Sequence, residues 1–106
     1  MKLPTNTIIE PRKVSHYLLR RLDDSDKSAF LALAGYNSRN SERLLEDIRT
    51  QLLPLETELI GPFEYGVKHA IRGTLRGPNG RSLRVLSIWA TLNSTGETRF
   101  LTLYPD

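Results

Sequence analysis

The chain has 106 residues, of which 39% are hydrophobic and 25% are charged, and this composition is typical of a folded domain rather than a disordered segment. It contains no cysteine, which excludes a disulfide framework, a thiolate metal site and a cysteine nucleophile. His16 and His69 lie far apart without a nearby acidic cluster, so we expect neither a metal site nor a cofactor.

The first residues, Met1 to Pro4, lack an apolar signal region, and no apolar run is long enough to span a bilayer. We therefore expect a cytoplasmic protein without a membrane partner, built as one domain over residues 1–106. Residues 1–9 are predicted to form an extended lead-in with a short edge strand through Thr7–Ile9. Residues 10–53 are predicted to form a helical part, and residues 55–104 an antiparallel sheet.

Three helices are predicted in the first half of the chain. Glu10-Pro11 favours a helix start, and Val14, Leu18 and Leu22 form its apolar stripe. The acidic run of residues 23–26 offers N-caps for a second helix, which buries the apolar side chains Phe30, Leu31 and Leu33 and ends at Gly35. Residues 37–40 cap a third helix, which carries Leu44, Leu45, Ile48 and Leu52 and ends before Pro54.

Three strands are predicted at residues 66–76, 81–92 and 98–104, separated by turn signals at residues 77–80 and 93–96. Residues 55–60 alternate loosely and predict a further strand. The fold class is therefore α+β, with two or three N-terminal helices packed on one face of an antiparallel meander of about four strands.

Alternation sorts the strand residues onto two faces, provided that both hairpin loops contain two or four residues, because an odd loop or a bulge would exchange the faces of one strand. The predicted face toward the helices collects the apolar side chains Val67, Ile71, Leu75, Leu86, Ile88, Ala90, Leu92, Leu101 and Leu103. The opposite face collects Lys68, Arg72, Arg76, Ser87, Trp89, Thr102 and Tyr104. The whole predicted core comprises Leu18, Leu22, Phe30, Leu44, Ile48, Leu52, Ile71, Leu86, Ile88, Leu101 and Leu103.

The distribution of charge also indicates the face of the sheet away from the helices as the functional one. The net charge is +3, and residues 66–86 contain five basic residues and no acid, whereas acids concentrate at residues 42–64. Such a surface favours a polyanion, and the alternative is a solvated strand surface with solubilising charges. Trp89 either stacks on a nucleobase or packs across the strands on Phe100; we favour the packing role, and the two roles are compatible. His69 is expected to point toward the helices.

Several motifs resemble a bacterial family of unknown function whose members are small standalone proteins or C-terminal modules. The motifs are Pro11-x-Lys13, the turn at Gly35, Gln51-Leu52-Leu53-Pro54, Tyr65-Gly66-x-Lys68, Arg72-Gly73-x-Leu75, Gly77-Pro78-Asn79-Gly80, Trp89 and Thr102-x-Tyr104-Pro105. The resemblance spans nearly the whole chain and implies no activity.

The order of helices and strands, closed by Thr102-x-Tyr104-Pro105, is also similar to the barnase, EndoU, colicin-tRNase and RelE superfamily of toxin ribonucleases. That resemblance implies metal-independent RNA cleavage by attack of a 2′-hydroxyl on the adjacent phosphate, on the sheet face away from the helices. Thr102 and Tyr104 match the hydroxyl positions of the closing strand, and Lys68 and Arg72 match the need for cations. The chain departs from the EndoU pattern because it lacks two front-facing histidines.

The leading functional hypothesis is a metal-independent endoribonuclease of the toxin type, with RNA as its partner. Lys68, Arg72, Thr102 and Tyr104 are the candidate catalytic residues, expected to converge closely enough for one phosphate-sized anion to touch at least two of them, with Ser87 opposite Thr102. Arg76, Ser87 and Trp89 are the candidate nucleic-acid-binding residues. The alternative is a non-catalytic module that binds a nucleic acid or a protein partner.

Overall fold

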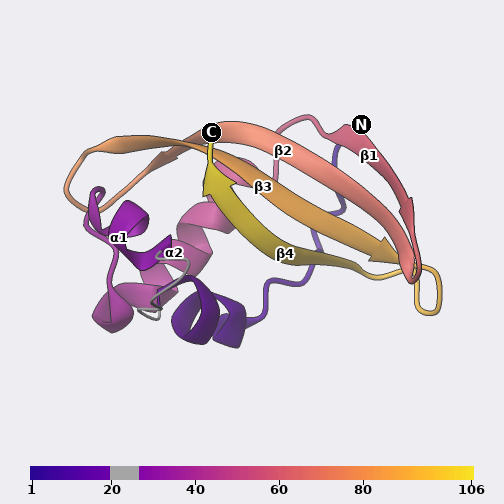
Figure 1. Cartoon of the computed structure of the whole chain (residues 1–106), viewed down its shortest axis with the longest axis horizontal. Coiled ribbons are helices and arrows are strands. Elements are labelled where there is room, and N and C mark those ends of the chain that lie inside the picture. Colours follow the sequence, from indigo (N-terminus) through magenta and orange to yellow (C-terminus); the bar gives the residue numbers. More distant parts are fainter. Residues whose placement is uncertain (20–26) are drawn as a thin grey trace.

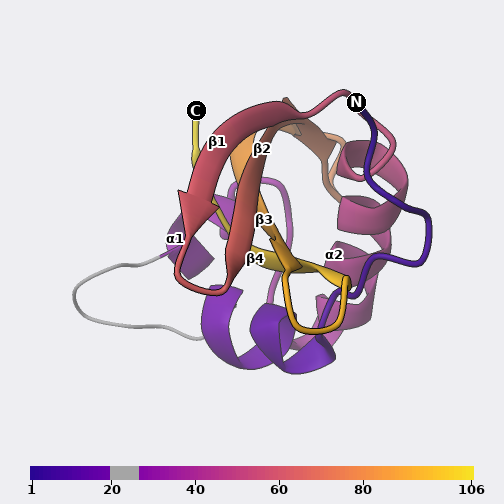
Figure 2. The same ribbon diagram turned by 90° about the vertical axis from the view of Figure 1, so that its right-hand side faces the viewer.

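A computed structural model gives the fold and describes residues 1–19 and 27–106, except for the side chains of residues 16 and 17. Helical segments come first in the chain and a four-stranded sheet follows, so the α+β class is confirmed. The helices gather on one side of the sheet and beneath it (Figures 1 and 2). The predicted core position Leu22 and the predicted caps at residues 23–26 lie outside the described residues.

The helical part is more broken than the sequence predicts. It consists of the π-helical turn η1 (Lys13–Leu18), α1 (Lys27–Ala32), the 3-10 turn η2 (Ser38–Asn40), α2 (Ser41–Asp47) and the π-helical turn η3 (Ile48–Leu52). The last three segments are continuous in sequence from residue 38 to residue 52, so the longest helical run lies mid-chain rather than at the N-terminus.

Both predicted helix boundaries in the middle of the chain are found. After α1 the chain turns at Gly35, whose φ of 92° suits glycine, and the N–H of Tyr36 donates back to the carbonyl oxygen of Leu31. Asn37 and Asn40 then form a reciprocal capping box at the start of the next helical run. Leu33 is 52% exposed, so its predicted burial is wrong, because α1 ends at Ala32 and Leu33 belongs to the turn that follows.

The sheet is an antiparallel meander of four strands in sequence order, as predicted. Its strands are β1 (Glu58–Phe63), β2 (Gly66–Arg76), β3 (Ser82–Leu92) and β4 (Thr98–Pro105). The lead-in contributes an isolated parallel bridge between Ile8 and Arg99, which covers part of the β4 edge. β1 begins at Glu58 rather than at the predicted residue 55.

The predicted faces are right for β2 and wrong for β3. Ile71 and Leu75 of β2 are fully buried, as expected. On β3 the buried positions are the odd ones, because Arg76 pairs with Ser82 and leaves a loop of five residues, 77–81, between the strands. The odd loop length turns every β3 side chain to the face opposite to the predicted one. Leu86 and Ile88 are consequently only half-buried, away from the helices.

A bulge in β4 then exchanges the faces a second time. Trp89 pairs with Phe100, but Ile88 pairs with Thr102, so Leu101 is the extra residue. Thr102 and the following Tyr104 therefore lie on the face away from the helices, as predicted. Phe100 lies in the core, and Leu101 is half-buried rather than a core residue. Ser87 pairs with Leu103, so its predicted position opposite Thr102 is wrong.

The core lies between the helical part and the face of the sheet that carries the odd-numbered residues of β2 and β3. Trp89 and Phe100 pack there edge to face, with ring centroids 5.1 Å apart. Phe30 packs against this core while remaining partly exposed. The predicted core residues that are fully buried are Leu18, Leu44, Ile48, Leu52, Ile71 and Leu103. In residues 1–19 and 27–106, no helix has the length and apolar character needed to cross a bilayer.

Candidate functional site

The face of the sheet away from the core carries most of the residues selected from the sequence, and we call it the outer face. It is formed by Phe63 of β1, Lys68, Ala70, Arg72 and Arg76 of β2, Arg84, Leu86 and Ile88 of β3, and Thr102 and Tyr104 of β4. The four candidate catalytic residues all lie on this face. They reach it because the odd loop and the β4 bulge compensate each other, not because both loops are even.

The outer face has a centre at Lys27, the first residue of α1, which the sequence analysis did not single out. The ammonium group of Lys27 donates a hydrogen bond of 2.5 Å to the hydroxyl oxygen of Thr102. The same nitrogen lies 4.3 Å from the ring centroid of Tyr104, within cation–π range. Tyr104 is 45% exposed, whereas Thr102 is buried beneath these contacts. Lys27, Thr102 and Tyr104 thus bring a cation, a hydroxyl and a phenol together on β4, and we call these three residues the Lys27 cluster.

Arg72 lies in the same cross-strand row as Tyr104, with Leu86 between them. Two strand spacings separate their backbones, roughly 10 Å. The guanidinium donates to Asp106 at 2.6 Å and to Glu58 at 3.4 Å. These two carboxylates, Asp106 above all, raise the pKa of Arg72 above its usual value. Arg72 is therefore firmly cationic but already paired, partly with an acid from the 42–64 region.

Lys68 does not join the Lys27 cluster. It pairs with Gly61 and Ala90, one row away along β2 from Ala70, Ile88 and Thr102. Its ammonium group lies 5.1 Å from the ring centroid of Phe63. The expected convergence of Lys68 with Thr102 on one phosphate is therefore not supported by the register. Arg72 and Lys68 flank the Lys27, Thr102 and Tyr104 cluster instead.

Ser87 and Trp89 lie on the core face, so the prediction that they contact a ligand on the opposite face is wrong. Both side chains are fully buried. The indole N–H of Trp89 donates to the hydroxyl oxygen of Ser87 at 2.8 Å, and the Ser87 hydroxyl donates to the carbonyl oxygen of Ile71 at 2.9 Å. The hydroxyl therefore satisfies the indole inside the core, and the packing role favoured for Trp89 is confirmed.

His69 also points to the core side, as predicted. It pairs with Trp89, is buried, and lies 3.3 Å from the hydroxyl of Thr91. Burial disfavours the charged imidazole and lowers the pKa of His69 below its usual value. This histidine has no path to the outer face and cannot serve as an acid or base there.

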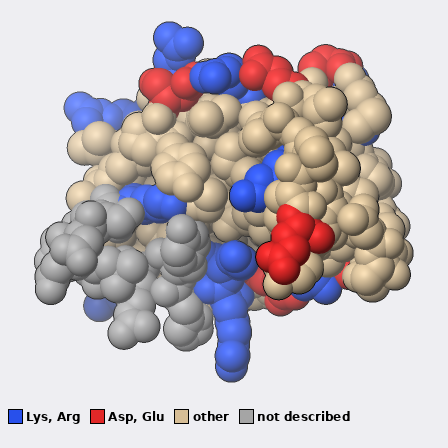
Figure 3. Space-filling view, turned by 45° about the vertical axis from the view of Figure 1, so that its right-hand side comes forward, with Lys and Arg blue, Asp and Glu red and all other residues tan. Residues whose placement is uncertain are grey.

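Basic side chains continue along the outer face toward the β2–β3 hairpin. Arg76 and Arg84 are exposed on that face, and Arg81 is exposed in the loop. Over the described surface in Figure 3, basic groups are separated by uncharged surface, and one basic group lies near the middle of the view. Acidic and basic groups alternate along the upper margin. The basic residues of the outer face are therefore spread along β2, β3 and the hairpin loop.

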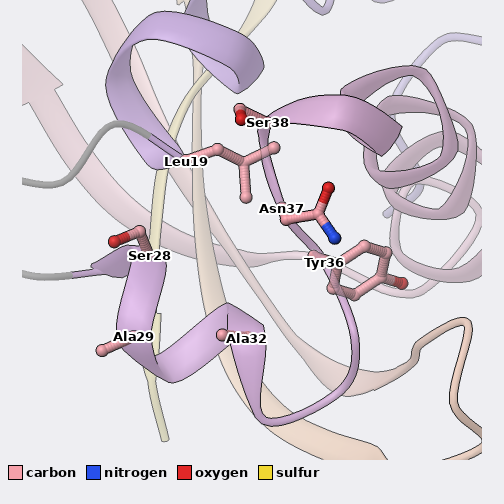
Figure 4. A pocket seen from close by; sticks show the side chains of 7 residues that line it. All are labelled: Leu19, Ser28, Ala29, Ala32, Tyr36, Asn37 and Ser38. Carbon is pink, nitrogen blue, oxygen red and sulfur yellow. The ribbon is translucent and has the colours of Figure 1, made fainter.

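A pocket of about 300 Å³ lies within the helical part rather than on the outer face. Figure 4 shows side chains of α1 on one side of it and residues 36–38 on the other. The described lining residues are Leu19, Ser28, Ala29, Ala32, Tyr36, Asn37 and Ser38. Tyr36 is the one ionisable residue among them, and its hydroxyl is engaged with the Asp47 carboxylate at 2.6 Å. The described lining residues therefore offer no free acid or base.

In residues 1–19 and 27–106 there is no group of three or more His, Asp or Glu side chains that could hold a metal ion.

The chain belongs to the family described as "Domain of unknown function (DUF6883)", whose model matches residues 2–106. None of the curated proteins compared with the chain matches its sequence. The fold is similar to one chain of a contact-dependent growth inhibition toxin–immunity protein complex from Klebsiella pneumoniae 342. That match has a TM-score of 0.59 at 14% identity and covers 94% of this chain and 100% of the other.

Proposed function

We propose that this member of the family is a toxin-like domain whose outer face binds RNA, and that Lys27, Thr102, Tyr104 and Arg72 form a metal-independent RNA-cleaving site. The observation that carries the proposal is the Lys27 cluster, in which an ammonium group is held by the Thr102 hydroxyl beside the half-exposed Tyr104 ring. The fold shared with one chain of a toxin–immunity protein complex supports a toxin-like role and a protein-binding role alike.

The cleavage chemistry follows from the groups present. The 2′-oxygen of the substrate attacks the adjacent phosphorus while the bond to the 5′-oxygen breaks, which leaves a 2′,3′-cyclic phosphate and a 5′-hydroxyl. The phosphoryl oxygens gain negative charge in the transition state, and the Lys27 ammonium and the Arg72 guanidinium stabilise that charge. Thr102 holds the Lys27 side chain in place. Tyr104 orients the leaving oxygen through its hydroxyl.

Proton transfer distinguishes this site from one built on histidines. His69 faces the core, so the 2′-hydroxyl gives its proton to solvent and the 5′-oxygen takes one from solvent. We therefore expect a slow enzyme whose rate rises with pH across the neutral range, because solvent hydroxide becomes more abundant.

The test is cleavage of total RNA by the purified protein in EDTA, with detection of 2′,3′-cyclic phosphate ends. Lys27→Gln should lower the rate by about 10²–10³-fold, as removal of a transition-state donor does. Lys2→Gln, at an exposed lysine outside the outer face, is the matched control and should leave the rate unchanged. RNA that stays intact at high protein concentration, together with normal growth of cells that express the domain, would exclude the enzyme.

A second candidate function is a protein-binding module without chemistry. The observation in its favour is apolar exposure at the β1 edge, where Leu59 is 71% exposed and Ile60 is 53% exposed. A complex held by phosphate contacts should weaken steeply with salt, in proportion to the number of phosphates neutralised. A complex that resists salt and is lost in Leu59→Asp would instead establish the protein-binding role.

A further inference from the structure

An aromatic and cationic cluster lies at the β1–β2 turn, on the side of Lys68 away from the row that carries Thr102. Phe63 and Tyr65 meet edge to face, with ring centroids 6.1 Å apart and an interplanar angle of 76°. The ammonium group of Lys68 stands over the Phe63 ring at 5.1 Å. The three side chains come from the end of β1, the turn and the start of β2.

The exposure of this cluster sets it apart from the other aromatic pair of the sheet. Trp89 and Phe100 are almost completely buried, whereas Tyr65 is 64% exposed and Phe63 is half-buried. An aromatic face left in water is free to cover another flat apolar group. Among the ion pairs of residues 1–19 and 27–106, none involves Lys68.

The backbone holds the turn in place. The carbonyl oxygen of Tyr65 accepts a hydrogen bond of 2.9 Å from the N–H of Asn93 in the β3–β4 loop. Gly66, which follows, passes so close to β3 that a Cβ built on it would lie 1.9 Å from the carbonyl oxygen of Thr91. Because both contacts tie the turn to the neighbouring hairpin, the Tyr65 ring stands on a fixed support and not on a loose loop.

We propose that Phe63, Tyr65 and Lys68 form a subsite for one unpaired nucleobase of an RNA strand, an inference that rests on the proposed function. The base stacks on the exposed Tyr65 ring, and the Lys68 ammonium contacts the phosphate beside it. Glu64 is exposed in the same turn, and its carboxylate fits a neutral base better than a second phosphate.

The position of the subsite agrees with one strand of RNA that crosses the sheet. Thr102 shares a row with Ile88 and Ala70, and Lys68 is two residues from Ala70 along β2. The offset is roughly 7 Å along the strand and 10 Å across two strand spacings. A short run of unpaired nucleotides can bridge that span, whereas a duplex would hide the base from Tyr65. The subsite thus selects single-stranded RNA.

The experiment measures binding without cleavage. A short single-stranded 2′-O-methyl oligoribonucleotide is used because its blocked 2′-oxygen cannot attack the phosphate, and a set of abasic versions lacks one base at a time. Tyr65→Leu should weaken binding of the intact oligonucleotide by about 5- to 100-fold, the usual loss for one stacked base. Tyr65→Phe keeps the ring and should bind like the wild type. One abasic oligonucleotide, the one that lacks the base stacked on Tyr65, should bind the wild type more weakly by the same factor. Tyr65→Leu should not weaken the binding of that oligonucleotide any further.

Each other outcome also decides the matter. The subsite would be overturned if Tyr65→Leu weakened the binding of intact and of all abasic oligonucleotides equally, or did not weaken binding at all. The RNA-cleaving proposal would still stand in both cases. Tyr65-dependent binding by a protein that cleaves no RNA would keep the subsite and remove the cleavage. If the wild type bound no oligonucleotide, both proposals would fail, and the exposed rings would belong to the surface of a protein-binding module.

Discussion

Polar side chains have different surroundings on the two faces of the sheet. On the core face, Ser87 and Trp89 bond to each other, and the Thr91 hydroxyl lies within bonding distance of Thr98. In the described parts of the chain, no buried side-chain nitrogen or oxygen on either face lacks a hydrogen-bond partner. On the outer face, Lys27 and Arg72 are held by neighbours at solvent-accessible positions. A polar residue in a strand can therefore be assigned a functional role only when the face of the sheet on which it lies is known.

Truncation of one aromatic residue on each face gives the largest expected contrast. Trp89→Ala removes a fully buried side chain that packs on Phe100, and it should lower the free energy of unfolding by about 3–5 kcal/mol. Tyr104→Ala removes a half-exposed ring and should cost about 1 kcal/mol or less, while abolishing most RNA cleavage. Urea unfolding and the cleavage assay measure the two effects. Similar losses of stability in both variants would contradict the assignment of the faces.

Removal of one hydroxyl from each face should also separate loss of stability from loss of cleavage, with smaller effects than removal of the aromatic side chains. Ser87→Ala leaves the Trp89 N–H without its acceptor in the core, which should cost about 1–3 kcal/mol of unfolding free energy. It should leave cleavage by the folded protein intact. Thr102→Val removes the hydroxyl that accepts the Lys27 hydrogen bond, and it should reduce cleavage with a smaller loss of stability. Loss of cleavage in Ser87→Ala at a temperature where it remains folded would place that residue in the site after all.

The smallest expected effect is a pH dependence that arises on the core face. Because burial lowers the pKa of His69, the unfolded chain takes up a proton at a higher pH than the folded chain does. The free energy of unfolding should be highest above the unfolded pKa of about 6.5 and fall as the pH drops below it. His69→Gln should flatten this fall in urea titrations between about pH 7.5 and pH 5. An identical slope in both proteins would show that His69 stays neutral or solvated in both states.

Much of the fold could be predicted from the sequence because it follows from local chemistry. The β2 faces follow from alternation at Ile71 and Leu75, and the helix ends follow from Gly35 and the Asn37 cap. The faces of β3 could not be predicted, because the sequence from residue 77 to residue 81 fits a four-residue turn as well as a five-residue loop. One residue of difference decides where Trp89 points.

The candidate site was less predictable than the fold. The closing strand indicates Thr102 and Tyr104 as candidates, and strand alternation indicates Arg72. Lys27 stands 75 positions before Thr102 in the chain and carries no spacing signal, because its contact depends on where α1 meets β4. The sequence places Tyr65 only within a motif, because the exposure of an aromatic ring in a turn is a property of the folded chain.

The extra residue at Leu101 makes the surface of β4 depend on the bulge and not only on the side chains that the strand carries. If the bulge were straightened with Phe100 kept opposite Trp89, Thr102 would lie opposite Ser87 and turn its hydroxyl inward, while Leu103 would move out into water. Removal of Leu101 would instead leave Phe100 opposite Trp89 and Thr102 opposite Ile88, so family members that lack only this residue would present the same side chains to the same ligand. For this strand, the pairing of Thr102 with Ile88 is a better guide to shared activity than the number of residues between Phe100 and Tyr104.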